Sequence, residues 1–317
     1  MKPMNHLKSI FLASALILGI SITAHAEINV VSSVKPLHSL VSGVMEGVAR
    51  PDLIVKGSAS PHTHSLRPSQ ARQLEDADLV FWMGHELESF LEQPLEAIAT
   101  KGHIVELIDS SKLKKIKMRE GGMFDAHAHD DHDEHEGHDD HGHGEFDVHV
   151  WLDPENAKVL VDEIKLALIE LDPVNSSKYE SNSNKMNMKL DQLIDEVSKK
   201  LESEQGKGYV VFHDAYQYFE QRFGMSAVGS ITVSPEVVPG ANRIRELKNK
   251  INELNAHCVF SEPQFEPKLV STVIEGTQAN TGVLDPLGAS IKDGPELYFT
   301  LIRNMADSLH ECLSKKD

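Results

Sequence analysis

Short, near-continuous runs of Val, Ile and Leu recur along this chain and alternate with segments of helical periodicity. Such runs are typical of parallel strands that are covered on both faces. We expect strands at 29–33, 53–56, 79–83, 148–152, 209–212, 259–260 and 282–284. The segment 244–254 instead repeats apolar residues every three or four positions, as an amphipathic helix does. The pattern predicts an α/β fold, and 317 residues suffice for two cores.

A long helix is expected in the middle of the chain. Asp172 and Pro173 make a suitable N-cap and first helical residue, and helical signals continue to about residue 202. One apolar stripe runs along this segment: Tyr179, Met186, Leu190, Leu193, Val197 and Leu201. At the usual rise per residue the helix would be about 43 Å long, which is enough to span two lobes. We therefore expect lobes at 27–172 and 205–317, connected by a linking helix at 173–204.

The first 26 residues have the features of a cleaved secretory signal. Lys2 and Lys8 give a positive start, an apolar stretch covers 10–22, and Ala24-His25-Ala26 fits the small-residue cleavage pattern. No later stretch reaches about 18 consecutive apolar residues. No cysteine lies near the cleavage site for lipid attachment. We expect a free periplasmic protein in a double-membraned bacterium.

The chain has two cysteines, Cys258 and Cys312. In an oxidising compartment a disulfide is favoured over thiolate metal ligands or two reduced core thiols.

An acidic, histidine-rich segment lies between Asp125 and Asp147, with ten acidic residues and no Lys or Arg. Its composition cannot bury an apolar face, so we expect a disordered loop over 120–147. Neutral imidazole binds zinc, copper, iron and nickel, which favours weak, adaptable accessory metal binding over a merely solvated acidic loop. The histidines concerned are His127, His129, His132, His135, His138, His141 and His143.

The net charge excludes nucleic acid as an expected partner. It is -18 for the whole chain, and loss of Lys2 and Lys8 with the signal makes it -20. Binding to phosphates needs a basic face, whereas a negative field attracts cations.

Three further histidines and one aspartate lie in more ordered contexts. His62 and His213 come after expected strands, His149 lies within one, and Asp285 follows another. Polar residues beyond the carboxyl ends of strands in open α/β sheets converge in one crevice. Three neutral imidazoles and one carboxylate make a tetrahedral ligand set suited to zinc. We therefore interpret these four residues as a metal site.

Several segments carry a family resemblance over essentially the whole mature chain. They are SLRPS at 65–69, ADLVFWMGHELESFL from Ala77, HVWLDPENA from His149, VVFHDAYQYFEQRFG from Val210, SPEVVPGANRI from Ser234, SEPQF from Ser261 and VLDPLGASI from Val283. In these motifs and their order the chain resembles the metal receptors of bacterial zinc and manganese ABC importers, specifically the ZnuA-type periplasmic zinc-binding proteins.

The resemblance implies two α/β lobes, each with a parallel-type sheet flanked by helices, joined by one long rigid helix. It implies a metal in the cleft with His62, His149 and His213 as ligands, and a disulfide between Cys258 and Cys312. Zn²⁺ would be the transported ligand. The partners would be a membrane permease and its cytoplasmic ATPase, and we expect a monomeric receptor.

The fourth ligand is open. Some zinc-type members have Glu directly before the first ligand histidine, where this chain has Pro61. We favour Asp285 for that position, over a water molecule, a histidine of the acidic loop or, more weakly, His64. Manganese receptors of this superfamily have a carboxylate at the position of His213, so this histidine favours zinc over manganese.

The histidine-rich segment and the expected metal site also fit two other classes of protein. A periplasmic zinc buffer or chaperone would explain the histidine-rich segment equally well. A zinc hydrolase is less favoured, because the sequence has neither an HExxH motif nor a Gly-x-Ser-x-Gly elbow. We therefore expect a receptor and no enzyme.

Overall fold

The computed structural model describes residues 28–99, 101–119, 146–232, 239–254, 256–265 and 268–315. The expected signal peptide and the seven histidines of the acidic segment lie outside these residues. Within the described ranges, no helix is both long and apolar enough to cross a membrane.

Two four-stranded parallel sheets form the centres of two lobes. The first has the strand order β2-β1-β3-β4, and the second has the order β6-β5-β7-β8. The strands are β1 (Val30–Ser32), β2 (Asp52–Leu53), β3 (Leu79–Trp82), β4 (His103–Glu106), β5 (Tyr209–Val211), β6 (Ala227–Ser230), β7 (Cys258–Ser261) and β8 (Asn280–Val283). The expected α/β class with parallel sheets is confirmed.

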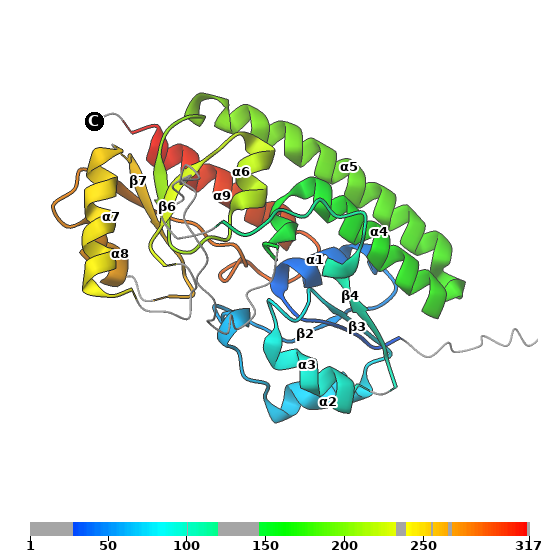
Figure 1. Cartoon of the computed structure of the whole chain (residues 1–317). Coiled ribbons are helices and arrows are strands. Elements are labelled where there is room, and N and C mark those ends of the chain that lie inside the picture. Colours follow the sequence, from blue (N-terminus) through cyan, green and yellow to red (C-terminus); the bar gives the residue numbers. More distant parts are fainter. Residues whose placement is uncertain are drawn as a thin grey trace, which may run out of the picture.

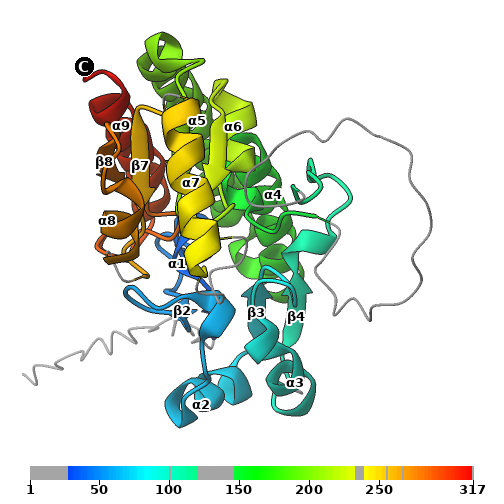
Figure 2. The ribbon, with the colours of Figure 1, turned by 60° about the vertical axis from the view of Figure 1, so that its left-hand side comes forward.

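Helices cover both sheets (Figure 1). Helices α2 and α3 lie beside the first sheet, and α7 and α8 lie beside the second. The long helix α5 runs along the side of the molecule opposite α2 and α3, at the top of both views (Figures 1 and 2). The helices are α1 (Lys35–Val44), α2 (Pro68–Asp76), α3 (Ser89–Ala97), α4 (Pro154–Leu171), α5 (Ser176–Leu201), α6 (Gln217–Phe223), α7 (Ala241–Glu253), α8 (Lys268–Ile274) and α9 (Leu297–Leu313).

The predicted apolar stripe of the long helix is confirmed, because all six of its residues are buried in α5. The helix begins slightly later than expected, since Pro173–Asn175 form a 3-10 turn before Ser176. The Asp172 carboxylate holds that turn, accepting hydrogen bonds from Asn175 Nδ2 and Tyr179 Oη, both at 2.7 Å.

The two lobes share a core. One cluster of buried apolar side chains extends from Val30 in β1 to Leu313 in α9 and includes residues of α1, α4, α5 and α9. A second, smaller cluster packs α7 and α8 against the outer face of the second sheet. Polar contacts also cross between the lobes. The Lys35 ammonium of α1 donates to the carbonyl oxygens of Ala289 (3.3 Å) and Ile291 (2.8 Å).

The expected strand at 148–152 is wrong, because Val150–Leu152 form a 3-10 turn with His149 as its N-cap. The Asp147 carboxylate accepts the His149 backbone N–H at 2.9 Å and starts this turn. Asp153 then caps α4 by accepting the backbone N–H of Glu155. The run is short and continuously buried, a pattern shared by strands and other buried segments.

The disulfide between Cys258 and Cys312 is present and connects β7 to α9, across 54 positions of sequence. It fastens the last helix to the second sheet.

Candidate metal centre

Three of the four predicted ligands come together between the lobes. Nitrogen atoms of His62, His149 and His213 all lie within 4.8 Å of one another. The ring centroids are 5.7 Å apart for His62 and His149, 5.9 Å for His62 and His213, and 5.3 Å for His149 and His213. Three neutral imidazoles at this spacing can hold one transition-metal ion.

Each histidine occupies a break in regular structure. His62 lies in a 3-10 turn that begins at Pro61, whose fixed φ suits the first position of a helical turn. His149 is the N-cap of the turn at Val150–Leu152. His213 lies two positions after Val211, the last residue of β5, at the carboxyl edge of the second sheet.

Two of the rings are fixed by buried carboxylates. His149 Nδ1 lies 2.7 Å from Asp147 Oδ1, and His213 Nδ1 lies 2.7 Å from Glu262 Oε1. The exposed fractions of these four residues range from 2% to 6%, so water competes little with either contact. Each contact directs the opposite nitrogen, Nε2, away from its carboxylate.

Burial and neighbouring charges shift the pKa values of His62 and His213 in opposite directions. Burial, with a smaller contribution from the neighbouring His149 and His213, lowers the pKa of His62 to about 2. Burial also lowers the pKa of His213, but the charge and hydrogen bond of Glu262 outweigh it, so that the pKa is raised. His62 is therefore neutral over the whole physiological range.

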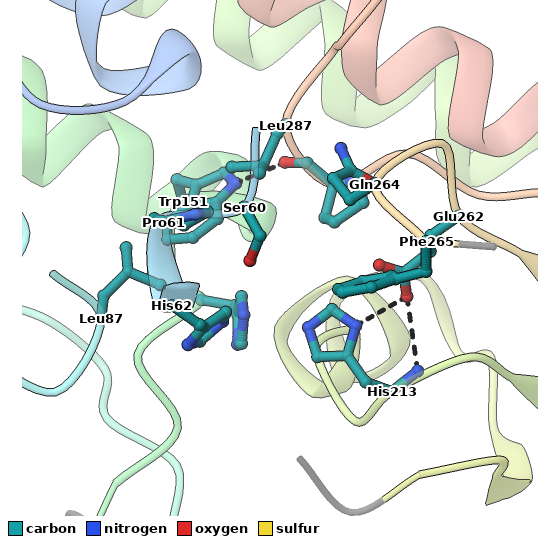
Figure 3. A pocket seen from close by; sticks show the side chains of 12 residues that line it. Ser60, Pro61, His62, Leu87, Trp151, His213, Glu262, Gln264, Phe265 and Leu287 are labelled. Atoms are coloured by element: carbon teal, nitrogen blue, oxygen red, sulfur yellow. Dashed lines mark hydrogen bonds and ion pairs between the residues drawn. The ribbon is translucent and has the colours of Figure 1, made fainter. Parts of the chain in front are cut away.

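The rings line a small cavity between the lobes, where His62 and His213 face each other (Figure 3). Apolar and aromatic residues close it, among them Leu87, Trp151, Phe265 and Leu287. The free volume is about 10 Å³, which is roughly the room that one water molecule needs.

Asp285, the preferred fourth ligand, is not part of this group. Its carboxylate accepts backbone N–H groups from Leu287 (3.1 Å), Gly288 (2.9 Å) and Ala289 (2.6 Å), and the side-chain amide of Gln264 at 2.9 Å. These bonds close a turn in which Gly288 has a φ of 71°, a value that favours glycine. The turn brings Pro286 and Leu287 to the cavity.

His64, the weaker candidate, is also outside the group. Its Nε2 lies 3.3 Å from Gln70 Oε1, and its ring packs against Phe90 with centroids 4.8 Å apart.

The carboxylates of Asp147 and Glu262 were not among the predicted site residues. A usable signal existed for Glu262. It directly follows β7, just as His213 follows the neighbouring strand β5, and between these two strands the order of the second sheet reverses direction. Ligands bind at such a switch point in open α/β sheets.

Fold and site together define a two-lobed α/β protein with a candidate metal centre of three buried or half-buried histidines between its lobes. A family model described as zinc-uptake complex component A, periplasmic (ZnuA), matches residues 30–312. The chain belongs to this family.

The chain is also similar to zinc uptake proteins over nearly its whole length. The high-affinity zinc uptake system protein ZnuA of Brucella suis is 51% identical, with 98% of this chain and 100% of the relative covered. The protein of the same name from Yersinia pestis is 37% identical, covering 97% and 98%. The periplasmic zinc-binding protein TroA from Treponema pallidum has the same fold, with a TM-score of 0.77, 19% identity, and 91% and 100% of the two chains covered.

Proposed function

We propose that this chain is a high-affinity periplasmic receptor that captures Zn²⁺ between its lobes and delivers it to an ABC-type zinc importer. The convergence of the His62, His149 and His213 nitrogens within 4.8 Å supports this most directly. Membership of the ZnuA family supports the choice of zinc. In this role zinc is cargo, and the protein is a binding component and no enzyme.

The proposed ligand set is His62, His149 and His213. For the fourth position, the four hydrogen bonds already made by the Asp285 carboxylate argue for a water molecule or a histidine of the acidic segment over Asp285 itself. Neutral nitrogen ligands favour zinc over manganese, because manganese prefers oxygen ligands.

Residues 1–26 are a signal peptide, and residues 27–172 and 205–317 are lobes connected by 173–204. The histidines of 120–147 form a weaker accessory site. The receptor acts as a monomer and docks on an inner-membrane permease driven by a cytoplasmic ATPase.

Calorimetric titration of the mature chain with Zn²⁺ tests the binding site. We expect one tight ion in the wild type and in a variant lacking 125–145, and its loss in His213→Ala. His85→Ala is the matched control, because His85 is a half-exposed histidine of the first lobe outside the group. Tight binding that survives His213→Ala would contradict the proposed site. Equal affinity for manganese and zinc would contradict the choice of metal.

A growth experiment separates a receptor from a buffer or chaperone. A receptor is needed for uptake, so cells without this protein should take up less zinc and grow poorly when zinc is chelated. A buffer predicts normal uptake with altered tolerance of excess zinc. Hydrolytic turnover that depends on His213 would favour an enzyme instead.

A further inference from the structure

We propose that Asp147 and Glu262 are positioning residues of the metal centre. Each carboxylate holds one ligand imidazole with its proton on Nδ1 and its Nε2 lone pair directed at the ion, and together they bring two negative charges to a divalent cation. This inference rests on the proposed function, because it takes the three histidines to be the ligands.

The two carboxylates act through the same geometry in different lobes. Oδ1 of Asp147 meets both the backbone N–H of His149 (2.9 Å) and its ring Nδ1 (2.7 Å). Oε1 of Glu262 meets both the backbone N–H of His213 (3.4 Å) and its ring Nδ1 (2.7 Å). An ionised carboxylate only accepts hydrogen bonds. Nδ1 must therefore donate in both rings, which leaves Nε2 as the lone-pair nitrogen of the neutral imidazole.

The free nitrogen of His213 agrees with this tautomer. His213 Nε2 is fully buried and makes no hydrogen bond to any described residue. A buried nitrogen lone pair without a partner is costly, unless a hydrogen-bond donor or a metal ion binds to it. The ring faces the cavity, and the dashed contacts to Glu262 lie on its opposite side (Figure 3).

The second oxygen of each carboxylate makes no contact with a positively charged group among the described residues. Oε2 of Glu262 is buried without a hydrogen-bond partner at ordinary distance among the described residues, and the neutral hydroxyl of Tyr216 lies near the same carboxylate. Oδ2 of Asp147 accepts only a neutral amide, Gln217 Nε2 at 3.2 Å. Gln217 belongs to α6 in the other lobe, so Asp147 is held from across the cleft. Neither carboxylate is charge-compensated by these contacts, whereas a dication between the imidazoles would compensate both.

His62 differs from the other two histidines. No described residue forms a hydrogen bond with its ring, and it is half-buried while they are buried. The site therefore has two imidazoles that are oriented by carboxylates and one, His62, that no described carboxylate orients. Loss of a carboxylate should weaken binding through the ring that it holds and leave His62 unaffected.

The orientation is tested in the full mature chain without metal, by nitrogen-15 NMR of the histidine rings. At a pH high enough for the rings to be neutral, we expect the Nδ1–H form for His149 and His213 in the wild type. In Glu262→Ala the His213 ring should shift towards the Nε2–H form, and in Asp147→Ala the His149 ring should do the same. Thermal unfolding identifies any variant that fails to fold. For such a site the zinc titration of Glu262→Gln or Asp147→Asn carries the test, because the amide oxygen still accepts from Nδ1 and the tautomer is then expected to stay unchanged.

Zinc titration of the same variants tests the consequence. We expect binding that is about 10- to 100-fold weaker in the alanine variants. Glu262→Gln should lie between them and the wild type, because its amide oxygen still accepts from Nδ1 while the charge is lost. The matched control is Glu204→Gln, since Glu204 is a buried carboxylate that holds another histidine, His310 Nδ1, at 3.1 Å. It should leave zinc affinity unchanged.

The inference is overturned if the ring tautomers do not change when the carboxylates are removed, or if zinc affinity stays within about twofold of the wild type. A wild-type chain that does not bind zinc tightly would instead refute the proposed function. The tautomer measurement uses no metal, so the two failures can be told apart.

Discussion

The indole Nε1 of Trp151 donates to the carbonyl oxygen of Pro286 at 2.9 Å, and this hydrogen bond connects the two lobes beside the candidate metal centre. The Trp151 backbone carbonyl in turn accepts from Tyr298 Oη at 2.6 Å. The ring centroids of Trp151 and His149 lie 5.2 Å apart. One residue of the first lobe thus contacts a candidate ligand, a turn of the second lobe and the last helix.

Trp151 should report metal binding. An ion held by His149 changes the electric field at the neighbouring indole, so zinc should alter the intrinsic fluorescence of the protein. The chain has only two tryptophans, and Trp82 is buried in β3. We expect the zinc-dependent change to persist in Trp82→Phe and to vanish in Trp151→Phe, as measured by fluorescence titration. The reverse pattern would speak against the site.

Replacing Asp285 should affect stability more than zinc binding. Asp285→Ala removes a carboxylate that accepts three backbone N–H groups and the Gln264 amide. We expect a loss of about 1–3 kcal/mol in the free energy of unfolding, because those donors lose their partner. Denaturant unfolding and zinc titration measure the two effects. A loss of zinc affinity as large as that of His213→Ala would identify Asp285 as a ligand after all.

Removing Arg119 should destabilise the metal-free protein strongly. Its guanidinium contacts Asp214 Oδ2 and Glu220 Oε2, each at 2.9 Å, and the two carboxylate side chains are only 11% and 5% exposed. Arg119→Ala leaves both carboxylates without this partner, at an expected cost of about 3 kcal/mol in unfolding free energy.

A matched surface pair provides the control for Arg119. Lys112 pairs with Glu163 at 3.1 Å, but its side chain is 61% exposed. Lys112→Ala should change stability by no more than about 1 kcal/mol. Equal costs for the two substitutions, in the same urea titration, would show that burial of the Arg119 cluster contributes little.

Glu88 should make stability depend on pH. This residue is fully buried, its Oε2 accepts the backbone N–H groups of Met83 (2.9 Å) and Gly84 (3.0 Å), and burial raises the pKa of its carboxyl from 4.5 to about 7. Between these two values the folded state binds the proton and the unfolded state does not. The stability contributed by this proton is therefore complete below pH 4.5 and is lost as the pH rises through about 7.

Glu88→Gln removes this titration. The unfolding free energy of the wild type relative to the variant should fall by about 3 kcal/mol as the pH rises across that window. Urea unfolding of zinc-free protein at a series of pH values measures the difference, and other carboxylates cancel in it. A difference that does not vary with pH would refute the assignment to Glu88.

Strong periodic patterns were predictable from sequence, and short segments were less so. The stripe of α5 and the buried runs of β1, β3 and β5 follow from hydrophobic pattern alone, because burial there is continuous along one face or the whole strand. The strands β4 (HIVE) and β6 (AVGS) were missed. β4 is an edge strand without buried residues, and β6 has little apolar side chain to mark it.

The residues of the candidate site also differed in how far the sequence predicted them. The histidines were predictable because their residue type is unusual after apolar runs. Whether Asp285 caps a turn or binds the metal was not predictable, because both roles use a carboxylate after a strand. The N–H groups of Leu287, Gly288 and Ala289 around its oxygens, which favour the first role, depend on the folded turn. The approach of Glu262 to His213 depends on strand order, since 49 positions of sequence separate them.

The small free volume between the three imidazoles has a consequence for the form in which a metal ion can enter. About 10 Å³ admits roughly one water molecule, so an arriving ion must give up nearly its whole hydration shell before all three rings can reach it. Mg²⁺ dehydrates reluctantly and usually keeps several waters in protein sites, so it would be turned away by the energy of stripping its water as well as by nitrogen ligands. In a compartment where Mg²⁺ is abundant, the pocket would therefore select by dehydration.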